Sequence, residues 1–266
     1  MKKQLLIIGF VWPEPTSSAA GSRMLQLIKL FQSFDFKIHF VSSAKRSAQT
    51  FDLNSLGLTT SSITLNDSSF DSFIAELNPD AVIFDRFMTE EQFGWRVAEQ
   101  CPKAIRILDT EDFHGLRKGR EIALRQGLPF DIKHLQNDTT KRELASIYRC
   151  DLSLIISQAE LEILKRDLKV DGQLLCYLPF LLNTADLATV ENLPKYEERQ
   201  HFITVGNFRH PPNYDAVMYL KERIWPLIKC ELPEAELHIY GAYPNQNALN
   251  LHNEKEGFLI KGYVED

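Results

Sequence analysis

The stretch FITVGNFRHPPNYDAVMYLKERIWPLIKCELPEAELHIY, residues 202–240, decides the fold together with the residues that follow it. Three short apolar runs predict strands, and the amphipathic segments between them predict helices: strands at 202–205, 236–240 and 258–260, and helices at 214–229 and 244–253. A series of this kind is one half of a doubly wound parallel sheet.

The same alternation runs backward to the N-terminus. The continuous apolar run Leu5-Leu6-Ile7-Ile8 is typical of a strand that is buried on both faces. Residues 21–31 carry apolar side chains at helical spacing. The remaining pattern predicts strands at 37–42, 63–65, 81–84, 104–108, 152–156 and 174–178, and helices at 70–77, 90–100, 115–125, 134–149 and after Ser157. The chain is therefore predicted to be α/β with parallel sheets.

The alternation of predicted strands and helices is interrupted at residues 183–201, which are polar and charged. We expect an N-terminal Rossmann-like domain at 1–185, a linker at 186–200 and the first half of a second Rossmann-like domain at 201–266. The second domain is therefore expected to be incomplete. Its last strand, 258–260, would lack a covering helix and expose apolar surface.

Composition excludes several classes of protein. The formal net charge of −6 gives no general attraction for phosphate backbones, so nucleic acid is not expected as a partner. Four widely spaced cysteines, none in a C-x-x-C pair, favour buried thiols in a reducing compartment over disulfides or a metal site. We expect a cytoplasmic protein.

Targeting and membrane signals are weak. Residues 1–20 superficially copy a secretory signal peptide, although the apolar run is short and also fits a strand and its turn. No apolar run is long enough for a transmembrane segment. Peripheral contact with the inner membrane face stays open.

The first candidate site is the long loop 11–23, because ligands of doubly wound sheets bind beyond the carboxyl ends of strands. Gly21 would let backbone amides approach a phosphate, and Arg23 would add positive charge. The alternative is a helix cap followed by an exposed arginine. No G-x-G-x-x-G motif follows a strand, so no dinucleotide cofactor is expected.

The second candidate site is the segment 109–117, which crowds carboxylates, an imidazole and a guanidinium after one strand. Its carboxylates favour helix capping, but His114 and Arg117 favour a functional role at the edge of a cleft. Asp112 and Arg86 are kept as candidate cleft residues. An arginine beside an aspartate, as in Asp85-Arg86, is more often a structural pair.

The third candidate site is the loop 206–213, between a strand and a helix. Gly206 and Arg209 are candidate ligands for a diphosphate, with Asn213 as the expected N-cap of the helix. An ordinary loop closed by two prolines is the alternative.

Four segments carry further motifs: RILDTEDFHGLRKGR at 106–120, SQAE at 157–160, YLPF at 177–180, and the stretch 202–240 followed by Gly241. Together these motifs resemble those of bacterial family 4 glycosyltransferases. The resemblance implies a GT-B fold, in which two Rossmann-like domains face each other across a cleft. The donor would bind mainly the second domain and the acceptor mainly the first.

The resemblance also implies an activity. Such enzymes transfer a sugar with retention from a nucleotide-diphosphate sugar to a glycan, a lipid-linked or another acceptor, often in cell-surface polysaccharide synthesis, and usually without a metal or other cofactor. By position, Gly21 matches the glycine that approaches the donor phosphates. His114 matches a cleft histidine that contacts the transferred sugar, and Arg209 lies near a basic residue that neutralises the departing diphosphate.

Two departures leave alternatives open. No lysine follows Arg209 closely, and the family's E-x7-E segment is absent from the sequence. We therefore expect the 266-residue chain alone to bind nucleotide sugars weakly and to transfer nothing. One alternative is a non-catalytic remnant or binding subunit that keeps the acceptor domain. The other is a metal-dependent GT-A transferase, although residues 109–112 have D-x-x-D spacing and not D-x-D.

Overall fold

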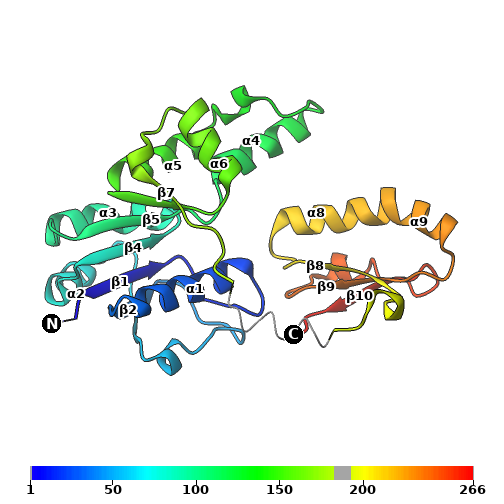
Figure 1. The fold of residues 1–266 in the computed structure, drawn as a ribbon, viewed down its shortest axis with the longest axis horizontal. Coiled ribbons are helices and arrows are strands. Elements are labelled where there is room, and N and C mark those ends of the chain that lie inside the picture. The colour runs from blue at the N-terminus through cyan, green and yellow to red at the C-terminus, as the bar shows by residue number, and fades with distance from the viewer. Residues whose placement is uncertain (1, 183–192, 266) are drawn as a thin grey trace. The chain divides into compact units, whose positions relative to one another are not determined.

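A computed structural model describes residues 2–182 and 193–265. The chain forms two compact units, which are described separately (Figure 1). The first contains residues 1–13 and 23–181, and the second contains residues 14–22 and 182–266. The predicted linker, 186–200, begins among residues that are not described, so its bounds stay a prediction.

The first unit is built on a seven-stranded, fully parallel sheet with the order β3-β2-β1-β4-β5-β6-β7. The strands are β1 (Gln4–Gly9), β2 (Lys37–Ser42), β3 (Thr59–Ser62), β4 (Ala81–Asp85), β5 (Ile105–Asp109), β6 (Leu152–Ile155) and β7 (Leu175–Tyr177). The strand predicted at 63–65 lies a few residues too far along the chain, because the strand that pairs with β2 is β3, which ends at Ser62.

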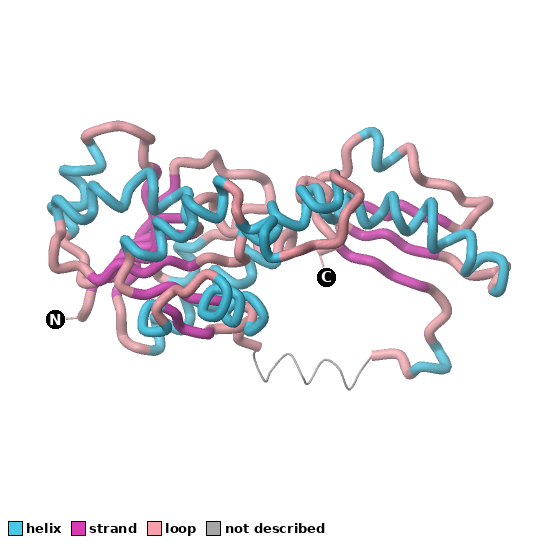
Figure 2. The backbone as a smooth tube through the Cα atoms, turned by 90° about the horizontal axis from the view of Figure 1, so that it is seen from above, coloured by secondary structure: helices cyan, strands magenta, loops and turns pink. Residues whose placement is uncertain are grey.

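Helices cover both faces of this sheet, as Figures 1 and 2 show. They are α1 (Ala19–Ser33), α2 (Ser69–Leu77), α3 (Phe87–Gln100), α4 (His114–Arg125), α5 (Asp138–Arg149) and α6 (Gln158–Glu162). Side chains alternate along β1: Leu5 and Ile7 pack in the core that includes α1, and Leu6 and Ile8 pack in the core that includes α2 and α3. Burial on both faces explains why this strand is continuously apolar.

The second unit contains a three-stranded parallel sheet with the order β10-β9-β8. Its strands are β8 (Phe202–Val205), β9 (Leu237–Tyr240) and β10 (Phe258–Gly262). Helices α8 (Pro211–Tyr219) and α9 (Trp225–Glu231) are joined by a π-helical turn, and α10 (Gln246–Leu249) is short. Their apolar side chains, including Val217 and Trp225, pack with Leu237 and Ile239 in the second unit's core. The predicted separate sheet is confirmed.

The expectation about exposed apolar surface is wrong in its location. All three residues 258–260 are buried, because β10 pairs with β9 and packs in the core that includes Ala248 of α10. Strand β8 does carry exposed apolar side chains, since Ile203 and Val205 are 67% and 73% exposed. Within residues 193–265, no strand pairs with the other edge of β8.

The expectation that the cysteines are buried is confirmed for two of the four. Cys101 and Cys150 are buried, but Cys176 is half-buried and Cys230 is exposed. Among the described residues, no helix combines the length and apolar character that a membrane span requires.

Candidate functional site

The candidate site lies at the carboxyl edge of the first sheet. The strand order reverses direction between β1 and β4, and the loops that leave these strands diverge there. Open α/β sheets bind their ligands at such a switch point. The loop after β1 is joined to the end of β4, because the Phe10 amide donates to Asp85 Oδ2 over 2.9 Å.

Two aspartates lie side by side at this edge, because Asp85 and Asp109 are register partners at the ends of β4 and β5. Both are buried. Asp109 accepts hydrogen bonds from Arg23 Nε at 3.0 Å and Nη2 at 2.8 Å. Arg23 Nη1 also donates to the Leu178 carbonyl over 2.9 Å. Burial raises the pKa of Asp109, and Arg23 counteracts that rise.

The burial of Arg23 argues against its predicted role as a charge for a bound phosphate, and it contradicts the alternative of an exposed arginine after a helix cap. Its side chain is 2% exposed, and its guanidinium donates hydrogen bonds to Asp109 and to the Leu178 carbonyl. A charge that is already neutralised inside the protein is a poor partner for a phosphate in solvent. We assign Arg23 the role of anchoring α1 to the end of β5.

Arg86 and Glu111 form a second ion pair beside the first. Arg86 Nε and Nη2 lie 2.9 Å and 2.7 Å from Glu111 Oε2. Burial and the neighbouring Asp85 raise the pKa of Glu111 to about 8, against the opposing effect of Arg86. The Arg86 guanidinium also lies 5.1 Å from the centre of the Phe10 ring. Arg86 thus links the loops on both sides of the switch point.

Both members of this pair have left-handed backbones, with φ of 70° at Arg86 and 58° at Glu111. Such a conformation costs a non-glycine residue of the order of 1–3 kcal/mol and is concentrated at functional sites. Sequence reasoning kept Arg86 as a cleft candidate but did not single out Glu111.

His114 begins α4 and is held on three sides. Its Nδ1 lies 2.9 Å from the Asp112 carbonyl oxygen, which can only accept, so Nδ1 carries a proton. Its ring packs edge-on against Phe87, with centroids 5.5 Å apart. Burial lowers the pKa of His114, but the Glu143 carboxylate and Asp112 outweigh burial, so its pKa lies above the ordinary histidine value.

Glu143 holds the start of α4 in place, and it was not predicted from the sequence. It lies on α5, is fully buried, and accepts hydrogen bonds from the Gly115 amide at 2.9 Å and the His114 amide at 3.3 Å. These amides belong to the first turn of α4, whose own N-cap, Phe113, offers no polar side chain. Burial raises the pKa of Glu143, and His114 opposes that rise.

A glycine allows the two helices to approach. A Cβ at Gly115 would lie 2.8 Å from the Thr140 Cα atom, so a larger residue would push α5 away. Asn137, the N-cap of α5, donates to the Gly115 carbonyl over 3.1 Å. The pattern Gly115 to Glu143 spans 28 residues, and only the folded α4–α5 pair brings them together.

Asp112 and Arg117 form the outer part of the site. Their side chains are 36% and 38% exposed, and Arg117 Nη1 lies 3.2 Å from Asp112 Oδ2. Asp112 Oδ1 also lies 3.5 Å from His114 Nδ1. Half-buried Glu160 has one carboxylate oxygen without a hydrogen-bond partner, and burial raises its pKa. The structure thus brings Asp112, His114 and Arg117 together, as predicted for neighbours in sequence.

The candidate donor residues of the second unit lie around the start of α8. Gly206 lies close to Asn213, whose side-chain carbon would be 3.0 Å from an added Cβ. The Arg209 guanidinium lies over the Tyr243 ring, 3.6 Å from its centre. Asn213 is not the N-cap, because α8 begins at Pro211, and its side chain donates to the Asn207 carbonyl instead.

Gly21 lies in the first turn of α1, where its amide donates to Ser18 Oγ over 3.1 Å. A Cβ at Gly21 would come within 2.6 Å of three backbone atoms of Glu14, so the loop requires glycine there. Gly21 belongs to the second unit and His114 to the first. The expectation that they line one cleft stays a prediction.

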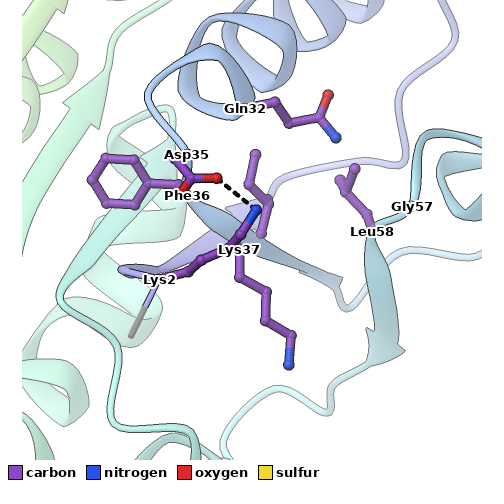
Figure 3. A pocket seen from close by; sticks show the side chains of 8 residues that line it. Lys2, Gln32, Asp35, Phe36, Lys37, Gly57 and Leu58 are labelled. Atoms are coloured by element: carbon purple, nitrogen blue, oxygen red, sulfur yellow. Dashed lines mark ion pairs between the residues drawn. The ribbon is translucent and has the colours of Figure 1, made fainter.

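A shallow hollow of about 300 Å³ lies elsewhere on the first unit, and Figure 3 shows its lining. It opens beside Lys37, where β2 begins, and Lys2 pairs with Asp35 at its rim. This is the amino edge of the parallel sheet, opposite to the edge that carries Asp85 and Asp109. The hollow is therefore not part of the candidate site.

The sequence matches no protein-family model, and a search of the curated proteins finds no similar sequence. Solved structures with a similar fold exist. They include sucrose-phosphate synthase from Thermosynechococcus elongatus, with a TM-score of 0.59 and 14% identity over 92% of this chain and 64% of that one. The lipopolysaccharide outer core galactosyltransferase WaaB gives a TM-score of 0.53 and 14% identity over 98% of this chain and 68% of that one.

A third similar structure is a UDP-GlcNAc 2-epimerase from Neisseria meningitidis bound to UDP-GlcNAc. It gives a TM-score of 0.52 and 13% identity over 98% of this chain and 71% of that one. The chain thus spans about two thirds of the length of these structures. At such identities the similarity shows the fold alone, and the fold is GT-B-like, with two Rossmann-like units.

Proposed function

We propose that the chain is the acceptor-side domain and the beginning of the donor-side domain of a retaining glycosyltransferase. Its donor is a nucleotide-diphosphate sugar and its acceptor a glycan, a lipid-linked molecule or another acceptor, in cell-surface polysaccharide synthesis. Two parallel sheets and the similarity to a galactosyltransferase support this proposal over a GT-A transferase, which has one domain. Asp109 is also committed to Arg23, so the D-x-x-D segment offers no pair of free carboxylates for a metal.

The observation that carries the proposal is His114, held by Glu143 beside the switch point of the first sheet. Because Nδ1 is engaged by the Asp112 carbonyl, a ligand would be met by Nε2. The raised pKa favours the protonated ring, which donates a hydrogen bond and carries positive charge. Both properties suit contact with a sugar hydroxyl that lies next to a departing diphosphate.

The other residues receive roles by position. Asp112, Arg117 and Arg86 are the acceptor-side residues, since they lie at the carboxyl edge of the first sheet. On the donor side, Gly206 and Arg209 would approach the diphosphate at the start of α8, and Gly21 would do so from its own loop. We expect action in the cytoplasm, with contact at the inner membrane face when the acceptor is lipid-linked.

The test is turnover by the complete natural gene product that carries this sequence, with a panel of UDP-, GDP- and dTDP-sugars. Replacing His114 with alanine should lower kcat by at least about tenfold, or about 1.4 kcal/mol, and should lower turnover more than it lowers folding stability measured by urea unfolding. Lys118→Ala is the matched control, because Lys118 lies on the same helix and pairs with Glu121 at the surface.

Each outcome decides between functions. Unchanged turnover in His114→Ala would remove His114 from the site. A product epimerised at C2, with no sugar transferred, would replace the transferase by an epimerase of the kind whose fold this chain shares. Co-purification with a partner and no turnover of any donor would favour the non-catalytic binding subunit.

The 266-residue chain itself is expected to bind these donors weakly and to transfer nothing. Among the residues described in the second unit, Arg209 is the basic residue of the loop before α8, and no lysine accompanies it there. Calorimetric titration with the same panel measures the affinity. Micromolar binding together with transfer would contradict this expectation.

A further inference from the structure

Three side chains with metal-binding atoms meet on one face of the second sheet. Glu236 and His238 are two residues apart at the start of β9, so their side chains point to the same face. The register pairs Phe202 with Leu237, which places His201 beside Glu236 on the neighbouring strand. The alternation of the two strands thus brings His201, Glu236 and His238 together.

Their geometry is close to that of a metal site. Glu236 Oε2 lies 2.8 Å from His238 Nε2 and 3.8 Å from His201 Nδ1. One ligand atom from each residue lies within 4.8 Å of the other two. In a tetrahedral site with bonds of about 2.0–2.1 Å, ligand atoms are about 3.3 Å apart. The observed separations bracket this value, so small side-chain rotations would complete the site.

The two imidazole rings lie close to each other. They stack with centroids 4.6 Å apart and an interplanar angle of 25°. An imidazole nitrogen offers its lone pair in the plane of the ring, so an ion would bind at the ring edges, beside the Glu236 carboxylate.

We propose that His201, Glu236 and His238 bind one divalent transition-metal ion, with Zn²⁺ as the best match. Two imidazole nitrogens and one carboxylate oxygen are a common zinc ligand set, and water fills the fourth position. Lys261 also lies close enough to Glu236 to act on it and opposes a cation. The ion would therefore bind more weakly than in a fully buried site.

The position of the site indicates a structural role. It lies at the amino ends of β8 and β9, whereas Gly206 and Arg209 follow the carboxyl end of β8. The ion would tie the residue that precedes β8 to the neighbouring strand. An ion that binds only the folded state stabilises it by mass action, so the thermal midpoint should rise with zinc concentration. This inference does not depend on the proposed function.

The test uses the tag-free 266-residue chain, stripped of metal with a chelator. Titration with ZnCl₂ should show one ion per chain, and Co²⁺ should give the visible absorption of a low-symmetry site. His238→Ala and Glu236→Gln should each weaken zinc binding by more than about tenfold, equal to about 1.4 kcal/mol.

Glu254→Gln is the matched control. Glu254 pairs with His252 at 3.8 Å on the same unit, but the described residues place no second histidine there to complete a site. It should leave zinc affinity unchanged. Far-UV circular dichroism tests whether each variant is folded. If His238→Ala does not fold, His201→Ala replaces it as the ligand variant. Binding that is absent in the unaltered chain, or equal in Glu236→Gln and Glu254→Gln, overturns the proposal.

Discussion

Strands β1 and β8 occupy the same position in two sheets with the same strand order, but the side chains of β1 are buried and those of β8 are largely exposed. β1 has β2 and then β3 on one side, and β8 has β9 and then β10 in the same order. β1 also pairs with β4 on its other edge. Within residues 193–265, β8 has no such neighbour. Ile7 of β1 is fully buried, whereas Val205 of β8 is 73% exposed.

The comparison teaches that an apolar run does not by itself make a core. Both runs predicted strands correctly, because local β propensity and short length suffice for that. Whether a strand is buried depends on which strand pairs with its edge and which helices cover its two faces. The apolar sequence of the strand itself predicts neither of these. The polar groups differ in the same way. The Arg23–Asp109 ion pair at the carboxyl edge of the first sheet is buried, whereas the Arg209 guanidinium lies over an aromatic ring in the second unit.

The largest effect is expected from breaking the buried pair of Arg23 and Asp109. Arg23→Ala leaves a carboxylate buried with no cation of its own, which costs about 3–5 kcal/mol of unfolding free energy. Urea unfolding measures the loss. The matched control is Arg117→Ala, which breaks an exposed pair with Asp112 and should cost about 0–1 kcal/mol.

A second variant separates the charge from the packing. Arg23→Met together with Asp109→Leu removes both charges and should recover much of the loss, since a buried ion pair is often no better than apolar side chains of similar volume. Equal costs for Arg23→Ala and Arg117→Ala would show that the Arg23 pair is not buried in solution.

An intermediate effect is expected from Glu143→Gln, which weakens the cap on α4 and the partner of His114. The raised pKa of His114 means that the fold favours its protonated form. This stability is complete below the ordinary histidine pKa of about 6.5 and is lost as the pH rises through the higher folded-state pKa. The advantage of the unaltered chain over Glu143→Gln, about 1–2 kcal/mol, should therefore shrink as the pH rises.

Urea unfolding across this pH range, with NMR titration of the His114 ring, measures the effect. Glu121→Gln is the control, because Glu121 is a surface carboxylate on α4 that pairs with Lys118. Curves for the unaltered chain and Glu143→Gln that stay parallel at all pH values would show that Glu143 does not act on the charge of His114.

The sequence predicted the elements better than it predicted the site. Six of the seven expected strands of the first sheet lie where alternation and apolar runs placed them, and the exception, 63–65, lies in a polar segment with little pattern. Helix starts were less well placed: α1 begins at Ala19, before Gly21, because the side chain of Ser18 caps it.

The site was predicted only where its residues are neighbours in sequence. Asp112, His114 and Arg117 fall in one segment, so their meeting needed no knowledge of the fold. Glu143 acts on His114 from 29 residues away, and a glutamate inside an amphipathic helix gives no signal of its own. The partner of Arg23 was missed for the same reason, since 86 residues separate it from Asp109.

The smallest effect is expected on β8 and tests the opening comparison directly. Val205→Thr changes an exposed side chain, so its unfolding free energy should stay within about 0.5 kcal/mol of the unaltered chain. Ile239→Ala on neighbouring β9 removes a side chain that is 1% exposed and should cost about 2–5 kcal/mol. Exposed apolar surface also favours association, so sedimentation velocity should show less self-association for Val205→Thr. If Val205→Thr costs as much as Ile239→Ala, then β8 is covered in solution and its likeness to β1 extends to burial.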